Sequence, residues 1–584
     1  MEINEVWRVR REILSVGREN FSTKELDRIK EIEQNYGLTS ITSVSLALLK
    51  EIQESREDSP DTQAIRISYA QQFSPDLPMP HYLYCRHILT KGFLNDLGEC
   101  IQGLKQELST SSGKLLIFSN LTLLSLTAFL FLSSLFFIYL ILRYRSSISH
   151  HYAHLLKGLS PLTVQLFTLF LFLLSWAGLG WIGPPLLITL LLWKYIGLQE
   201  RVVTCLLWIL SAAIPYALYF PALEINYEAG ILPVLEDPLN GTLLQERGTK
   251  LGEWLKKNSK DAEALFSLGL IQKKLGKTEL ARSNFEEAAK AKPGWAKPSV
   301  NLANLDYQEG KIDSAISRLQ AVISTSPSFL AYYDAAKIFY KQSRLDEGLQ
   351  ANKKAKGLDA GRFADLEQIT VNQNDAKKFL IDEKLDPKDL SPRIWEITPQ
   401  IEVIRTRLHR TYLPALPLPY YWIVIVLNLI LSIGMSQLFP VRRVPRPCEK
   451  CGLPSCVLCE PMIEHESLCS QCFHMYVRLE AIDLSARRSK ENSIRLYRFL
   501  REFRERWIGF FLPGMQYLFT DRALAWFFYS LFFLPAVVLI LFESFWIESP
   551  FTVSNLPHFP YHWIGISLGL FFYLITLTSI LRKT

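Results

Sequence analysis

Six of the nine cysteines lie in one short segment, CEKCGLPSCVLCEPMIEHESLCSQC, as three consecutive C-x-x-C pairs. A C-x-x-C turn points two thiolates at one ion, and two such turns complete the tetrahedral shell that zinc prefers. The first and last pairs are separated by 17 residues, a spacing typical of zinc-binding C-x-x-C pairs. We therefore predict one structural zinc ion, bound by the first and last pairs: Cys448, Cys451, Cys469 and Cys472.

The middle pair, Cys456 and Cys459, leaves two alternatives open. In one, this pair binds a second zinc ion together with His465 and His474. In the other, one C-x-x-C pair has a redox role, although no thioredoxin-like βαβ pattern surrounds the segment. Residues 448–472 resemble cytoplasmic zinc ribbons, and this resemblance implies a metal that holds together a segment too small for a core of its own.

No other residues form a convincing catalytic site, and we expect that the protein is not an enzyme. The sequence has no P-loop, no GxGxxG after a strand, no nucleophile elbow and no HExxH. We interpret His150, His151 and His154 as polar loop residues, and Asn240-Gly-Thr as a chance match to a glycosylation acceptor. Lys194 lies next to an apolar run, where snorkelling to the nearby membrane surface accounts for it.

Long apolar segments dominate the parts of the chain on either side of the cysteine cluster. The chain has 584 residues, is 49% hydrophobic and 21% charged, and carries a net charge of +7. These averages exclude a disordered or collagen-like chain, and the charge is too weak to indicate a nucleic-acid partner. About 20 apolar residues suffice to cross a bilayer. We predict seven spans: 115–142, 162–181, 186–197, 202–222, 420–439, 523–542 and 563–581.

Lysines and arginines in the short loops predict one orientation for all seven spans. Basic loops such as 143–157 and 441–446 are expected on the cytoplasmic side, whereas 543–562 has no Lys or Arg and is expected outside. This gives an outside N-terminus and a cytoplasmic C-terminus. The short third span has a re-entrant or interfacial helix as its alternative, but the loop pattern is consistent only when it crosses. Cytoplasmic thiols stay reduced, which argues against disulfides among the clustered cysteines.

Residues 1–113 are predicted to form a helical, repeat-like region outside the membrane. For Cys85 and Cys100 the alternatives are a disulfide and two buried thiols. The first residues, MEINEVWRVRREILSVG, lack the apolar core of a signal peptide. We therefore expect that the natural start lies upstream; the alternative is that the first span carries its N-terminal tail across.

An internal period of 34 residues runs through part of 223–412. Three pairs of residues have this spacing: Gly276 and Gly310, Ala281 and Ala315, and Pro293 and Pro327. A third copy follows one residue early. The unit LFSLGLIQKKLGKTELARSNFEEAAKAKPG resembles the tetratricopeptide repeat, in which small residues let two antiparallel helices approach and stacked neighbours bury their apolar faces.

The resemblance to tetratricopeptide repeats covers about 228–361, with Gln272 in place of an expected aromatic residue. It implies a concave groove that binds a partner protein; a spacer without a ligand is the alternative. The matching packing positions are Leu268, Gly269, Gly276, Ala281, Phe285, Ala288, Pro293, Ala303, Gly310, Ala315 and Pro327.

A basic amphipathic helix is predicted after the cysteines, within 479–512. Its apolar stripe includes Leu496, Phe499, Phe503, Trp507 and Phe510. Arginines recur every three residues, at Arg495, Arg498, Arg501 and Arg504. This pattern favours a helix at the membrane surface that faces anionic lipid, with a solvated helix packed on the zinc unit as the alternative.

Together, these features predict a mostly α-helical, polytopic membrane protein of the bacterial inner membrane, with a periplasmic α-solenoid and a small cytoplasmic zinc ribbon. The predicted function is a membrane-anchored scaffold whose repeats bind an envelope protein. A transmembrane sensor, or a transporter component that uses the first four spans, is the alternative. The predicted domains are 1–113 (helical), 114–222 (four membrane helices), 223–412 (solenoid), 413–440 (fifth membrane helix), 441–478 (zinc module), 479–512 (basic helix) and 513–584 (membrane hairpin).

Overall fold

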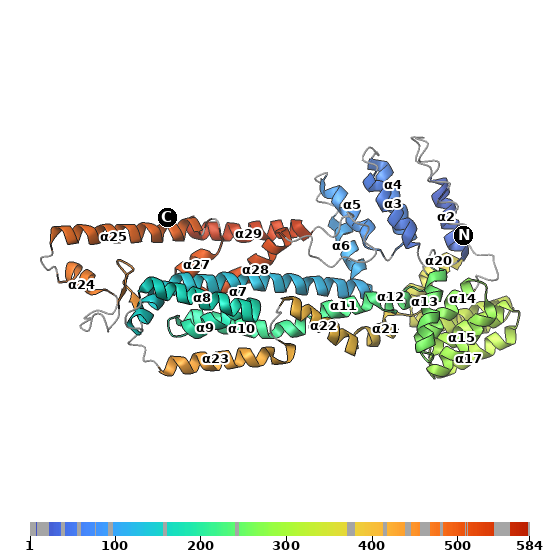
Figure 1. Cartoon of the computed structure of the whole chain (residues 1–584). Coiled ribbons are helices and arrows are strands. Elements are labelled where there is room, and N and C mark those ends of the chain that lie inside the picture. The colour runs from blue at the N-terminus through green and yellow to red at the C-terminus, as the bar shows by residue number, and fades with distance from the viewer. Residues whose placement is uncertain are drawn as a thin grey trace. The chain divides into compact units, whose positions relative to one another are not determined.

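The chain is mostly helical and divides into two compact units, each of which is described by itself (Figure 1). The first unit comprises Met1–Leu115, Leu223–Glu396 and Glu548–Phe559, and the second comprises Leu116–Ala222, Ile397–Ile547 and Pro560–Thr584. The structure is a computed structural model that describes residues 8, 23–36, 41–54, 60–75, 77–90, 97–155, 160–239, 244–370, 380–412, 417–438, 445–455, 468–478, 483–508, 510, 512–541 and 561–581.

The N-terminal part of the first unit consists of short helices that pack in sequence order. They are α2 (Lys24–Tyr36), α3 (Thr42–Glu54), α4 (Pro60–Phe73), α5 (Met79–Thr90) and α6 (Leu97–Glu107). Apolar side chains of α2, α3, α4 and α5 form one core that includes Leu26, Leu48 and Phe73, all fully buried. Cys85 lies in α5 and Cys100 in α6, but their side chains are outside the described part of the structure, so their predicted pairing stays untested.

Helical hairpins build a solenoid in the first unit (Figure 1). The pairs α14–α15, α16–α17 and α18–α19 are the three repeats, and α13 precedes them as a cap. The bounds are α13 (Leu244–Lys257), α14 (Ala262–Lys274), α15 (Thr278–Ala291), α16 (Ala296–Gln308), α17 (Ile312–Thr325), α18 (Phe329–Lys341), α19 (Leu345–Leu358) and α20 (Ala360–Thr370).

Small residues between the helices, and residues with a left-handed backbone conformation at the turns, allow these hairpins to close. A Cβ atom on Gly269 would lie 2.7 Å from the ring of Phe285, so only glycine lets α14 and α15 approach this closely. Each hairpin turns at a residue with positive φ: Gly276 at 75°, Gly310 at 80° and Ser343 at 61°. Ser343 follows Gly310 by 33 residues, which agrees with a third copy that begins one residue early.

Four helices are long and apolar enough to cross a membrane: Ser111–His151, Leu162–Leu192, Leu198–Ala229 and Ala523–Leu541. Two shorter apolar helices, Leu418–Gly434 and Ile564–Thr578, fall below that length within the described residues. The stretch from Leu162 to Leu192 is interrupted at Gly180, beyond which its second part packs back on its first.

The elements of the apolar region and its flanks are mostly in the second unit, with α12 and parts of α7 and α11 in the first. Their bounds are α7 (Ser111–Leu155), α8 (Pro161–Leu179), η2 (Gly180–Ile182), α9 (Gly183–Leu192), α10 (Leu198–Ala217), α11 (Tyr219–Ala229), α12 (Leu232–Glu236), α22 (Pro399–Tyr412), η4 (Leu418–Tyr420), α23 (Tyr421–Leu438), α27 (Met515–Phe519), α28 (Ala523–Leu541) and α29 (Tyr561–Leu581).

An aromatic core joins these apolar helices. Phe136 of α7 stacks on Trp526 of α28 with ring centroids 5.5 Å apart, and both side chains are almost fully buried. Asn428 of α23 donates a hydrogen bond of 3.1 Å to the carbonyl of Leu186 in α9. The helices therefore form one packed bundle, and they present many exposed Leu and Phe side chains on its outside.

The small module that carries the cysteines is also in the second unit. Strand β1 (Arg446–Pro447) pairs antiparallel with β2 (Pro454–Ser455), with Arg446 opposite Ser455. Helix α24 (Ser470–Tyr476) completes the module, and the long helix α25 (Leu484–Phe503) continues into η6 (Arg504–Ile508).

Candidate metal centre and repeat groove

Four buried thiols converge in the small module. Their Sγ atoms all lie within 4.8 Å of one another, and they belong to Cys448, Cys451, Cys469 and Cys472. The Sγ atoms of Cys451 and Cys469 are 3.7 Å apart, far beyond the length of a disulfide bond. A zinc ion at about 2.3 Å from each sulfur separates the sulfurs by roughly 3.8 Å. The donor set thus fits a tetrahedral metal site, as the sequence predicts.

Two local turns position the thiols. In the first, the Gly452 N–H donates to the carbonyl of Cys448 at 2.8 Å, and the Cys448 N–H donates to Leu453 at 2.9 Å. Gly452 has φ of 71°, a conformation that favours glycine. In the second, Cys469 caps the N-terminus of α24 and Cys472 lies in its first turn. Backbone N–H groups at both turns outweigh the effect of burial and lower the pKa of Cys448 to about 7, which favours the thiolate that binds metal.

The second predicted ion stays a prediction. Cys456, Cys459 and His465 lie outside the described residues, so nothing tests whether they approach one another. His474 lies on α24, with its ring 6.0 Å from that of Phe473.

Helix α25 packs on the cysteine module. Ile494 is 4% exposed and belongs to the same apolar cluster as the four cysteines. Lys490 is buried beside them and donates a 3.0 Å hydrogen bond to Gln471. Burial opposes the charge of Lys490, but the nearby Cys469 and other thiols outweigh it and raise its pKa. A cation here offsets the negative charge of a four-thiolate site.

The structure bears on one of the two interpretations of the basic helix, its packing on the cysteine module, whereas its contact with lipid stays a prediction. Its packed face carries Lys490 and Ile494, as the alternative requires. The remaining predicted residues are exposed and include both the arginines and the apolar stripe: Arg495, Arg498, Arg501, Arg504, Leu496, Phe499, Phe503, Trp507 and Phe510.

An ion-pair network at one end of the apolar bundle was missed by the sequence reasoning. Arg143, near the C-terminal end of α7, pairs with Asp521 and lies 3.4 Å from Glu200 at the start of α10. Tyr144 donates a 2.6 Å hydrogen bond to Glu200. Sequence reasoning used Arg143 only to orient the membrane, because its partners are 57 and 378 residues away. Lys194 itself is half-buried.

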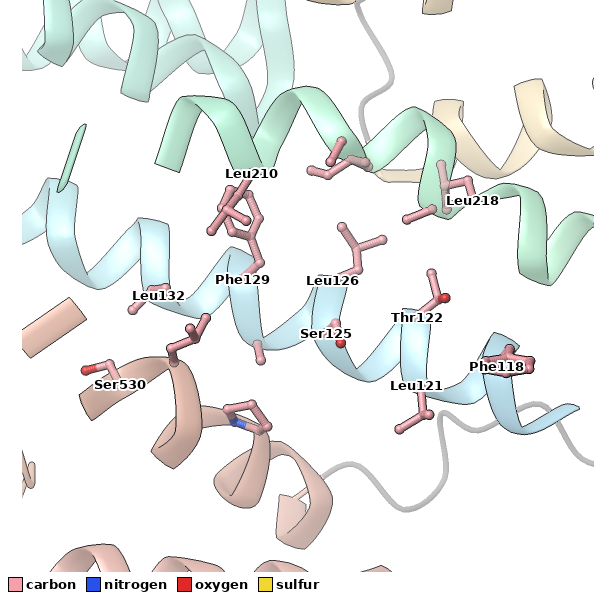
Figure 2. Close-up of a pocket in the computed structure, with 16 residues that line it drawn as sticks. Phe118, Leu121, Thr122, Ser125, Leu126, Phe129, Leu132, Leu210, Leu218 and Ser530 are labelled. Atoms are coloured by element: carbon pink, nitrogen blue, oxygen red, sulfur yellow. The ribbon is translucent and has the colours of Figure 1, made fainter. Parts of the chain in front are cut away.

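An apolar cavity of about 390 Å³ opens among three helices of the bundle (Figure 2). Leu126 and Phe129 of α7, Leu210 of α10 and Ser530 of α28 line it. Its lining is mostly apolar and carries no charged side chain. The interpretation of His150, His151 and His154 as loop residues is wrong, because α7 continues to Leu155 and includes them. His151 contacts Tyr195 edge to face, and the side chain of His154 is outside the described part.

The repeat residues predicted from sequence occupy distinct places. The helix-packing positions Gly269, Ala281, Phe285, Ala288, Ala303 and Ala315 are buried, and Leu268 is half-buried. Gly276 and Gly310 form the turns, and Pro293 and Pro327 follow the ends of α15 and α17. The packing pattern does not predict which repeat residues bind another segment of chain, and these residues are known only from the structure.

The first helices of the repeats present buried polar side chains to a non-helical segment of the same chain, residues 380–386. These side chains are Lys273 of α14, Asn301 and Asn304 of α16, and Asp334 of α18. The sequence analysis did not identify this segment as a ligand of the repeats. The sequence did carry a sign that these helices bind something. Asn301, Asn304 and Asp334 are polar, yet they lie in helices that the repeat pattern packs on both sides.

Asp334 gives the contact with this segment a predicted pH dependence. The side chain is fully buried, and it accepts a 3.1 Å hydrogen bond from the Ile381 N–H. Burial, together with the negative charges of Asp382 and Glu383, holds the pKa of Asp334 well above its usual value. The pKa of Glu383 is raised by burial as well, whereas the pKa of Asp382 is lowered, because Lys273 and other groups outweigh its burial.

Since Asp334 takes up a proton when the segment binds, binding is strongest at low pH and weakens as pH rises through the raised pKa. The lowered pKa of Asp382 has the opposite effect on binding, and only at pH values below 3.8, the ordinary pKa of this side chain. Asp334→Asn is uncharged and should reduce this pH dependence, leaving the part that the raised pKa of Glu383 contributes in the same direction. The measurement is hydrogen-exchange protection of the Ile381 amide, corrected for the intrinsic rate. The exposed Asp313→Asn serves as control, and an unchanged pH profile in Asp334→Asn would contradict the assignment.

A comparison with protein-family models agrees with the repeats. A family model described as tetratricopeptide repeat matches residues 300–363. Among solved structures, the crystal structure of MamA aligns with 18% identity and a TM-score of 0.21, and the alignment covers 30% of this chain and 98% of that one. No curated protein matches the chain. The protein therefore contains tetratricopeptide repeats, a class of solenoid that generally mediates protein–protein interactions.

Proposed function

We propose that this protein is a membrane-anchored scaffold, in which the repeats hold a protein partner on one side of a bacterial inner membrane and a zinc module with a basic helix acts on the other. The groove-lining polar residues of the solenoid carry this proposal, since a repeat surface that binds a peptide segment of its own chain has the chemistry to bind another. The four-thiol site supports a structural metal, because none of its positions is left for substrate.

The packing of the bundle supports seven alternating spans. Arg143 at the end of α7 meets Glu200 at the start of α10 and Asp521 just before α28, so α7 runs opposite to the other two helices. The hydroxyl of Tyr529 in α28 donates to the carbonyl of Phe572 in α29 at 3.0 Å. A short returning α9 is the third crossing, and the shorter α23 and α29 are the fifth and seventh.

Labelling of single cysteines tests this topology. In a background with Cys85, Cys100, Cys205, Cys456 and Cys459 replaced by serine, which keeps only the four predicted metal ligands, we expect Lys290→Cys on α15 to react with a membrane-impermeant maleimide in intact spheroplasts. Arg488→Cys on α25 should react only after permeabilisation. Both positions are exposed, so accessibility of the side chain is matched. Equal labelling of both positions in intact spheroplasts would overturn the proposed sidedness.

Photo-crosslinking from the full chain in its native membrane tests the scaffold itself. A crosslinking residue at Lys353 on the solenoid should capture a discrete envelope protein, and the same residue at Arg488 should not capture it. Lys353 is exposed on α19, so the substitution leaves the repeat core intact. Absence of any discrete product from several exposed solenoid positions would argue for the spacer alternative.

A further inference from the structure

The polypeptide backbone of residues 380–386 is held by side chains of the repeats. Asn301 makes two hydrogen bonds to Glu383: its Oδ1 accepts from the Glu383 N–H at 2.8 Å, and its Nδ2 donates to the Glu383 carbonyl at 3.1 Å. Asn304 donates to the carbonyl of Ile381 at 2.8 Å. With the bond from Ile381 to Asp334, both backbone groups of Ile381 and both backbone groups of Glu383 bond to helices α16 and α18. Such bonds recognise a peptide whatever its side chains are.

Side chains of the segment supply the selectivity. Lys273 forms a 2.5 Å ion pair with Asp382, and the two side chains are only 8% and 10% exposed. Lys297 bonds at 2.7 Å to Asp386 and at 2.7 Å to Asp389. The buried pair of Lys273 and Asp382 favours an acid at position 382. A neutral or basic residue there is penalised, because it would leave Lys273 buried without its partner.

Apolar residues flank these acids at fixed positions. Leu380 is 7% exposed and belongs to the core of the second and third repeats, and Ile381 packs against the same core. Leu385 is 8% exposed. The bound pattern is therefore apolar–apolar–acidic, then two residues, then apolar–acidic, in a non-helical conformation.

We propose that residues 380–386 are a built-in competitor for the partner-binding groove, and that the partner presents an acidic, non-helical peptide with the same pattern. This inference rests on the proposed scaffold function and names the class of its ligand. The partner peptide replaces the segment on Asn301, Asn304 and Lys273. The repeats are thus closed at rest and open only to a peptide that outcompetes a tethered copy, whose effective concentration is of the order of millimolar.

A fluorescent peptide with the sequence of residues 380–391 is the probe, and the purified full chain is the receptor. The wild-type chain should bind it weakly. Asp382→Lys places two cations in one buried site and should release the segment, so that the peptide binds at least tenfold more tightly. Glu383→Pro removes the N–H that Asn301 accepts and should have the same effect. The exposed Asp346→Lys on α19 repeats the charge change outside the Lys273–Asp382 pair and should match the wild type.

Two further variants identify the contacts. Asn301→Ala in the Asp382→Lys chain should weaken peptide binding at least tenfold. Lys273→Asp in that same chain restores opposite charges at the two positions, so the segment should bind again and the affinity for the peptide should return to the weak wild-type value. Equal affinity of the wild-type and Asp382→Lys chains would show that the segment does not compete. No binding to the Asp382→Lys chain would exclude the acidic peptide class; either result overturns the inference. Crosslinking from Lys353 in native membranes tests the scaffold function separately. If a protein is captured there but the peptide assay shows no competition by the segment, this inference fails and the scaffold function remains.

Discussion

Replacing Cys472 with serine should remove the metal from the protein and unfold the small cysteine module. Cys472 is fully buried among the other three thiols, and serine supplies a much poorer ligand for zinc than a thiolate. Structural zinc in small modules stabilises them by roughly 10–16 kcal/mol near neutral pH, so little of the folded form should survive. We expect close to one zinc ion per wild-type chain and almost none in the variant.

Metal analysis of the purified chain measures the loss directly, and protease sensitivity of 445–510 measures unfolding. Cys205→Ser is the control, because Cys205 lies in α10 and is not part of the cluster. Chelation of the wild type should reproduce the effect of Cys472→Ser. About two zinc ions per wild-type chain would support the second predicted site at Cys456 and Cys459. Full metal content in Cys472→Ser would overturn the assignment of the four ligands.

The module should also govern helix α25. Ile494 and Lys490 pack against the cysteines, and the ring of Tyr497 lies directly beside Gly452. Loss of the metal removes the surface on which these side chains rest. The exposed arginines and aromatic residues of α25 would then lose their fixed orientation, which links metal binding to the proposed contact with anionic lipid.

Phe285→Ala should cost the repeat solenoid about 3–5 kcal/mol, the usual penalty for emptying a large buried aromatic position. The Phe285 ring is fully buried, lies against Gly269, and has its centroid 5.6 Å from that of Phe266. Leu280→Ala on the same helix is the control, because that side chain is 52% exposed and should change stability by roughly 0.5 kcal/mol or less.

Hydrogen exchange of the α14 and α15 amides is the appropriate measurement, because it reports the local free energy of opening in a chain whose units do not unfold together. Protection should fall in both helices of the first repeat and less in the third, since each repeat contacts only its neighbours. Equal protection in Phe285→Ala and Leu280→Ala would mean that Phe285 does not hold the hairpin together.

The sequence was sufficient for features whose partners are close along the chain. The 34-residue period, with Gly276 and Gly310 at the turns, could be read directly because each hairpin packs mainly on the next one. The convergence of Cys448, Cys451, Cys469 and Cys472 was also predicted, since two tight C-x-x-C turns leave each pair little choice of direction. The apolar segments were equally visible, although only four of them form helices long enough to cross a membrane in the described part.

Features that join distant residues were decided by the tertiary structure alone. Lys273 and Asp382 are 109 residues apart, and Asn304 and Ile381 are 77 apart. Lys273 and Asp382 are unremarkable in their own stretches of sequence, since lysine and aspartate are common on the surface of soluble proteins. Asn304 stands out only because the repeat pattern packs its helix on both sides, and nothing local says what it binds. Arg143 likewise gains Glu200 and Asp521 only when three helices meet. Repeat periodicity and ligand spacing are local constraints that the amino-acid order must satisfy, whereas a groove and what lies in it arise only from the folded chain.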